Sequence, residues 1–95
     1  MENKIKNLEN LLIENGFDNF ILIDESHKHS NHYFAEKEEI FPSHISATII
    51  SDIFKDKNTL MRQKSINKIL SPAFKNGLHA FSMKLYTNEE FKNKH

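Results

Sequence analysis

Only three short segments of the chain carry strand-like apolar patterns, and they limit the fold to one small sheet. Residues 20–23 form a continuous apolar run that ends at Asp24, which is typical of a strand buried on both faces. Apolar and polar residues alternate over residues 45–49 and again over residues 79–85, which predicts two strands with one buried face each. We expect the first two strands to form a hairpin.

Helical patterns occupy most of the remaining chain. Apolar residues spaced three and four apart predict a helix over residues 2–15. A second helix begins after Asn58, a residue that favours the cap position, and ends at Pro72. Thr87, followed three residues later by Glu90, has the form of a capping box and predicts a short last helix.

Together these elements predict one α+β domain over residues 1–95. Their order is α-β-β-α-β-α, with the helices packed on one face of a three-stranded mixed sheet. The chain has 95 residues, of which 38% are apolar. A core of this size closes one sheet against a few helices but does not enclose a large substrate cavity, so we expect a binding protein and not an enzyme.

Charge and cysteine content restrict the partners. Thirteen basic residues balance thirteen acidic residues, so no overall field draws the chain to nucleic acid or to an anionic membrane. No apolar run reaches the length of a membrane-spanning helix. Because the chain has no cysteine, it can supply no thiolate to an iron-sulfur cluster, and a cytoplasmic location fits best.

Histidines are the first candidate metal ligands. His79 opens a strand whose same-face neighbours are apolar, which places its imidazole at the rim of the core. His27, His29 and His32 lie close together in the segment that joins the first two strands, and imidazoles at such spacing can meet around a metal ion. The more common outcomes are a histidine bonded to a backbone carbonyl and a solvated polar loop. His44 we interpret as structural.

Two other groups of residues invite a functional reading. Six basic residues against one acid, Asp56, occupy residues 55–75, and among them Arg62, Lys64 and Lys68 could contact phosphates. Most such runs are solvated helix faces. The second group is the Asp-Glu-Ser sequence at 24–26, where a role in a turn is expected because adjacent side chains at a strand end point to opposite sides.

Read together, these motifs resemble the BolA family. The resemblance rests on the Leu-Ile-Asp-Glu-Ser run at 22–26 with His29 nearby, on the Ser-His pair that opens the second strand, and on the Leu-His-Ala-Phe-Ser run at 78–82. It extends over almost the whole chain and implies a KH-like α+β fold. The sequence departs from the family pattern at Asp56, where a glycine is usual, and in the second helix, where Arg-Gln-Lys at 62–64 replaces Arg-His-Arg.

The resemblance implies a non-enzymatic partner of monothiol glutaredoxins. In such a complex a shared 2Fe-2S cluster is held by a glutaredoxin cysteine, by glutathione and by histidine from the BolA-like protein. His79 would be the main ligand, and His29 would be the second, with His32 as its nearest competitor. A role in cluster delivery or in iron or redox sensing would follow. The alternative is a DNA-binding regulator that uses Arg62, Lys64 and Lys68.

Overall fold

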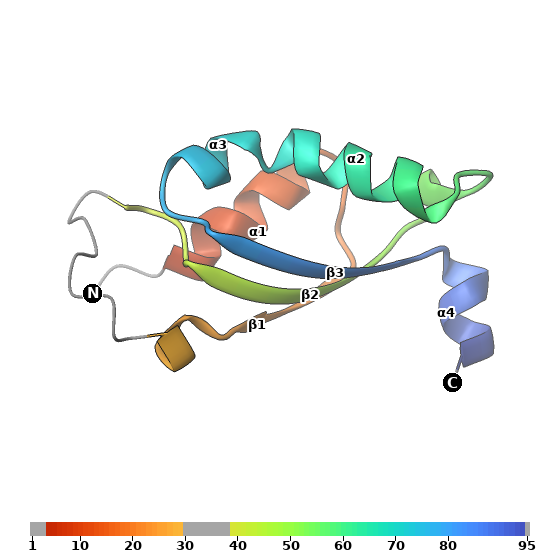
Figure 1. The fold of residues 1–95 in the computed structure, drawn as a ribbon. Coiled ribbons are helices and arrows are strands. Elements are labelled where there is room, and N and C mark those ends of the chain that lie inside the picture. Colours follow the sequence, from red (N-terminus) through yellow and green to blue (C-terminus); the bar gives the residue numbers. More distant parts are fainter. Residues whose placement is uncertain (1–3, 30–38, 95) are drawn as a thin grey trace.

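The computed structural model describes residues 4–29 and 39–94 and shows a three-stranded sheet with helices (Figure 1). Along the chain the elements are α1 (Lys4–Glu14), β1 (Phe20–Asp24), the 3-10 turn η1 (Ser26–His29), β2 (His44–Ile50), the 3-10 turn η2 (Asp52–Phe54), α2 (Thr59–Ile69), α3 (Ser71–Lys75), β3 (Ala80–Tyr86) and α4 (Asn88–Lys94). No helix within this part of the chain has both the length and the apolar character needed to cross a membrane.

The sheet is mixed, with strand order β1-β2-β3. β1 and β2 are antiparallel, with Phe20 opposite Ile49, whereas β2 and β3 are parallel, with His44 opposite Ala80. A parallel pair needs a crossover, and α2 and α3 supply it over one face of the sheet (Figure 1). α1 lies on the same face, so the predicted fold class is confirmed.

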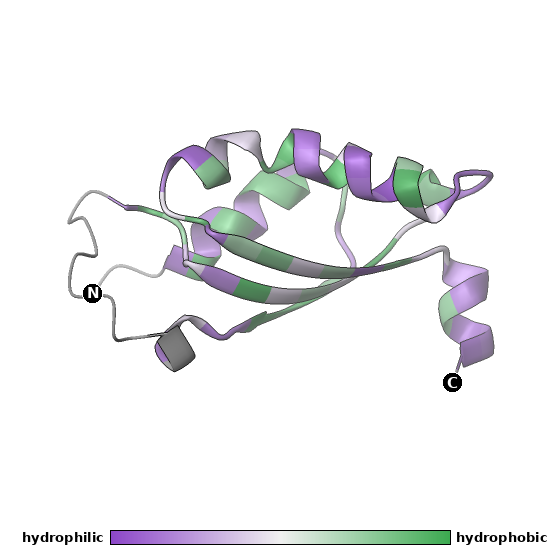
Figure 2. Cartoon of the chain, viewed as in Figure 1, coloured by the Kyte–Doolittle hydropathy of each residue, from purple (hydrophilic) through white to green (hydrophobic). Residues whose placement is uncertain are grey.

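The core lies between these helices and the covered face of the sheet. Alternation along β2 and β3 sends every second side chain toward the helices, and the alternating colours of the two strands follow this pattern (Figure 2). The largest fully buried side chains come from α1, β2, η2, α2 and the segments beside them; they are Phe17, Phe54, Leu8, Leu12, Ile49, Ile66 and Leu70. The apolar side chains of the strands and helices therefore pack together in one layer.

The predicted burial of β1 on both faces is wrong. Ile21 and Ile23 are 54% and 56% exposed, while Phe20 and Leu22 pack against the core. β1 is an edge strand, and none of the described elements covers its second face. A continuous apolar run cannot reveal this, because period-two alternation is lost when both faces carry apolar residues.

A second difference concerns Pro72, which does not end the helical region. α2 ends at Ile69, and a separate short helix, α3, starts at Ser71 with Pro72 in its first turn. A proline is tolerated there because the backbone N–H groups of the first turn have no partner within the helix. The predicted order therefore lacks one helix.

The predicted cap of α2 is found where expected, and a glycine allows the turn before β3. The side chain of Asn58 accepts a hydrogen bond from the Met61 N–H at 2.9 Å and caps α2. Gly77, which leads the chain into β3, has a φ of +123°, and a Cβ atom there would lie 2.8 Å from the Phe41 carbonyl oxygen. Only glycine fits this close approach.

Candidate metal centre

His79 lies at the N-terminal end of β3, directly before Ala80. Its backbone N–H donates a hydrogen bond of 2.8 Å to the carbonyl oxygen of Ser43, and the Ala80 N–H donates to the same oxygen at 3.0 Å. The His79 residue is exposed. Two strands thus fix its backbone, and its imidazole is accessible from outside the fold.

The ring of His44 lies beside the ring of His79. The two centroids are 6.2 Å apart and the ring planes differ by 24°. Nδ1 of His44 lies 2.9 Å from the hydroxyl oxygen of its neighbour Ser43. Parallel pairing of β2 with β3 brings the two histidines together, since His44 is opposite Ala80. Interpreting His44 as structural missed this proximity, which only the strand register could have indicated.

The Asp-Glu-Ser sequence forms the turn that was expected. Oδ1 of Asp24 accepts a hydrogen bond of 2.9 Å from the Ser26 N–H. The Ser26 hydroxyl oxygen in turn accepts hydrogen bonds from the backbone N–H groups of Ser43 and His44, at 3.0 and 3.2 Å. The turn therefore joins the end of β1 to the beginning of β2.

Of the two candidate loop ligands, His29 is the last residue of η1, three residues after Ser26. His32 lies outside the described residues. Within residues 4–29 and 39–94, no three side chains of His, Cys, Asp or Glu come together as a metal site. At this end of the sheet two imidazoles, those of His44 and His79, lie beside each other, and the chain has no cysteine to add a thiolate.

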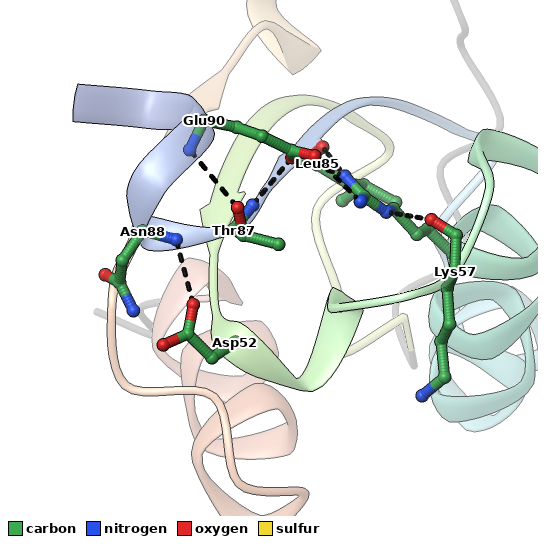
Figure 3. A network of polar contacts seen from close by, with 7 residues as sticks. Asp52, Lys57, Leu85, Thr87, Asn88 and Glu90 are labelled. Carbon is green, nitrogen blue, oxygen red and sulfur yellow. Dashed lines mark hydrogen bonds and ion pairs between the residues drawn. The ribbon is translucent and has the colours of Figure 1, made fainter. Parts of the chain in front are cut away.

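Arg62, a candidate phosphate contact, is committed to contacts within the protein. Its guanidinium forms a bidentate ion pair with the Glu90 carboxylate, with N–O distances of 2.6 and 3.0 Å (Figure 3). It also donates to the backbone carbonyl oxygens of Lys57 and Leu85 and lies over the ring of Phe54. Only 12% of the Arg62 side chain is exposed, so this group is not presented to a nucleic acid.

Lys64 and Lys68 differ from Arg62 because both are exposed on α2, one helical turn apart. The basic surface that remains for phosphates is therefore smaller than the sequence indicated.

An open cleft of about 540 Å³ lies near the opposite end of the sheet from His79, between η2 and α4. Acidic and basic side chains line it together, among them Asp52, Lys55 and Glu89.

Comparison with known proteins identifies the fold. Residues 16–90, most of the chain, match the family model described as "BolA-like protein". The chain belongs to the BolA family. Among solved structures, BolA1 from Arabidopsis thaliana aligns with a TM-score of 0.79 at 23% identity and covers 95% of this chain and 97% of that one. The BolA domain of SufE1 from the same plant aligns with a TM-score of 0.74 at 27% identity, over 95% and 98% of the two chains.

Curated relatives in the BolA comparison match over shorter stretches. An uncharacterized protein from Buchnera aphidicola is 52% identical over 52 residues, which are 54% of this chain and 66% of the relative. BolA-like protein 2 from Saccharomyces cerevisiae is 42% identical over 43 residues, which are 45% of this chain and 35% of the relative. The matched region thus spans slightly less than two thirds of the first relative and about one third of the second. The predicted family is confirmed.

Proposed function

We propose that this BolA-like chain is a non-enzymatic, cytoplasmic partner of a monothiol glutaredoxin. The two proteins hold a 2Fe-2S cluster between them as cargo, for delivery to other proteins or for sensing iron or redox state. The glutaredoxin supplies a cysteine thiolate and a bound glutathione, and this chain supplies histidine. His79 is the principal ligand from this side.

The exposed imidazole of His79 carries the proposal. A cluster ligand must reach iron from a fixed backbone, and the hydrogen bonds to the Ser43 carbonyl hold the residue where two parallel strands begin. Iron-sulfur clusters need thiolates, which this chain lacks, so a thiol-bearing partner is required. The membership in the BolA family supports the same partner class.

In this proposal the chain gives the cluster a second imidazole ligand beside His79. His29 and His32 are the candidates from the connection between β1 and β2, and His29 ends a turn whose first residue, Ser26, is bonded to the start of β2. Two imidazoles on one iron raise the potential of a 2Fe-2S cluster, as in Rieske centres. Since only neutral imidazole binds metal, protonation would promote release of the cluster.

The test is anaerobic reconstitution of the protein with the monothiol glutaredoxin of its organism, iron, sulfide and glutathione. We expect a visible absorption and circular dichroism spectrum that differs from that of glutaredoxin alone and that is lost or converted to the glutaredoxin-only spectrum in His79→Ala. His95→Ala, which removes an imidazole at the end of the chain, serves as the matched control. Failure of the wild-type protein to form a mixed complex would contradict the proposal, as would an unchanged spectrum in His79→Ala.

DNA binding is the second candidate function, supported by the exposure of Lys64 and Lys68 on one face of α2. This function predicts an affinity for duplex DNA that falls steeply with salt and is lost in Lys64→Glu/Lys68→Glu but kept in His79→Ala. Fluorescence anisotropy with a labelled duplex at physiological salt distinguishes the two candidates. If the charge-reversed variant binds the duplex as tightly as wild type, the α2 surface is excluded as the DNA-binding site.

A further inference from the structure

The hydroxyl of Ser26 occupies a central place in the backbone bonding around the candidate centre. Its oxygen accepts the N–H groups of both Ser43 and His44. These two N–H groups lie where the β1–β2 ladder ends, one step beyond the hydrogen bond of 2.9 Å from the Glu25 N–H to the His44 carbonyl. One side-chain oxygen therefore extends the ladder where no backbone acceptor is supplied by β1.

The connection continues from β2 to β3 through Ser43. While the Ser43 N–H is bonded to Ser26, the Ser43 carbonyl accepts the N–H groups of His79 and Ala80 at 2.8 and 3.0 Å. Hydrogen bonds thus connect Ser26, the first residue of η1, through Ser43 to the backbone of His79. The backbone N–H of His44 donates to the same Ser26 oxygen, and the His44 ring lies beside the His79 ring.

Alanine at position 26 would remove the shared acceptor from two partly buried N–H groups at once. Each of them would have to find water or move, because an unsatisfied donor away from solvent is costly. The start of β2 would then loosen, and the loosening would pass to His79 through Ser43. Metal ligands tolerate displacements of only about 0.5 Å before their geometry is lost.

We propose that Ser26 is a positioning residue for the candidate metal centre. Its hydroxyl holds the η1 turn against the starts of β2 and β3, and so fixes the backbone from which the imidazoles of His44 and His79 project. It touches no metal itself. This inference rests on the proposed function for its use, but the geometry that it asserts can be tested in the metal-free protein.

The first test measures amide hydrogen exchange by NMR in the metal-free protein. In Ser26→Ala we expect exchange at the Ser43 and His44 amides to accelerate about fivefold to tenfold, as the loss of one hydrogen bond to each predicts. The ring signals of His44 and His79 should shift as well. Ser26→Thr, which keeps the hydroxyl, should restore both readouts. The control is Ser82→Ala, the same change at an exposed serine of β3.

The second test uses the complex with the monothiol glutaredoxin. Ser26→Ala should still load the cluster but give an altered visible circular dichroism spectrum and a shorter cluster lifetime, with Ser26→Thr close to wild type. Unchanged exchange and ring shifts in Ser26→Ala would overturn the inference, and so would a wild-type spectrum and lifetime in the loaded complex. If the wild-type protein forms no mixed complex, the proposed function fails, and the metal-free measurements decide on Ser26 by themselves.

Discussion

Asp56 has a left-handed backbone conformation, with a φ of 63°. Among the residues that the structure describes, it is the one residue other than glycine with a positive φ. It lies in the turn between η2 and α2, at the position where the resemblance to the BolA family predicts a glycine. Aspartate tolerates this conformation better than most residues, but an L side chain still raises its energy by about 1–2 kcal/mol. The substitution thus leaves a small strain in the turn.

Relief of this strain is a prediction for Asp56→Gly. We expect its free energy of unfolding to rise by up to about 1 kcal/mol, because the gain is partly offset by the greater freedom of glycine in the unfolded chain. Denaturation in urea measures the change. Asp56→Ala, which has a Cβ but no polar side chain, should be less stable than wild type. A glycine variant that is less stable than wild type would contradict this explanation.

At the scale of elements, polar contacts at its first turn help to attach α4 to the rest of the fold, beside the contact between the Phe91 and Tyr86 rings. It has no buried residue of its own. The predicted capping box is present, since the Thr87 hydroxyl accepts from the Glu90 N–H at 3.2 Å and the Glu90 carboxylate accepts from the Thr87 N–H at 2.9 Å. The Asn88 N–H also donates to Asp52 of η2 (Figure 3). The same carboxylate of Glu90 binds Arg62 and so ties α4 to α2.

This arrangement predicts how acid affects the attachment of α4. The Arg62 guanidinium, helped by the Thr87 N–H, lowers the pKa of the Glu90 carboxyl from 4.5 to about 2. A lowered pKa in the folded state adds stability above pH 4.5, and that stability is lost as the pH falls toward 2. The stability difference between wild type and Glu90→Gln should therefore be constant above pH 5 and shrink below pH 4.5.

Thermal unfolding followed by circular dichroism, at intervals from pH 7 to pH 2, measures this difference. Glu89→Gln removes a charge one residue away but keeps the ion pair between Glu90 and Arg62, so it serves as the control and should keep the stability that this ion pair contributes. A Glu90→Gln difference that does not shrink in acid would mean that the ion pair does not stabilise α4.

At the scale of the whole molecule, the two faces of the sheet contribute unequally to stability. Ile49 of β2 faces the helices and is fully buried, whereas Ile21 of the neighbouring strand is 54% exposed on the other face. Truncation of a buried isoleucine to alanine costs about 2–5 kcal/mol, through lost burial and the cavity left behind. Total stabilities are about 5–15 kcal/mol, so this is a large fraction.

The matched pair Ile49→Ala and Ile21→Ala tests this asymmetry. We expect a loss within about 2–5 kcal/mol for the first and of about 1 kcal/mol or less for the second, where mainly strand propensity is lost. Urea denaturation of both variants gives the comparison. Equal losses would mean that the second face of β1 is covered in the folded protein.

The sequence by itself determined the elements whose signals are local. The Asn58 cap, the capping box of α4 and the alternation along β2 and β3 each depend on residues within a few positions of one another, and all are found in the structure. The motifs that indicated the BolA family are likewise short runs. His79 could be selected as the principal candidate ligand on this basis, and its accessible position is compatible with that role.

Only the tertiary structure decided which distant residues meet. The parallel pairing of β2 with β3 brings His44 beside His79, and the position of α4 after β3 places Glu90 in an ion pair with Arg62 of α2. The exposure of Ile21 likewise depends on whether another layer covers β1. These features rest on contacts between residues far apart in the chain, whose geometry is set by strand register and by the packing of the core, and no local pattern records them.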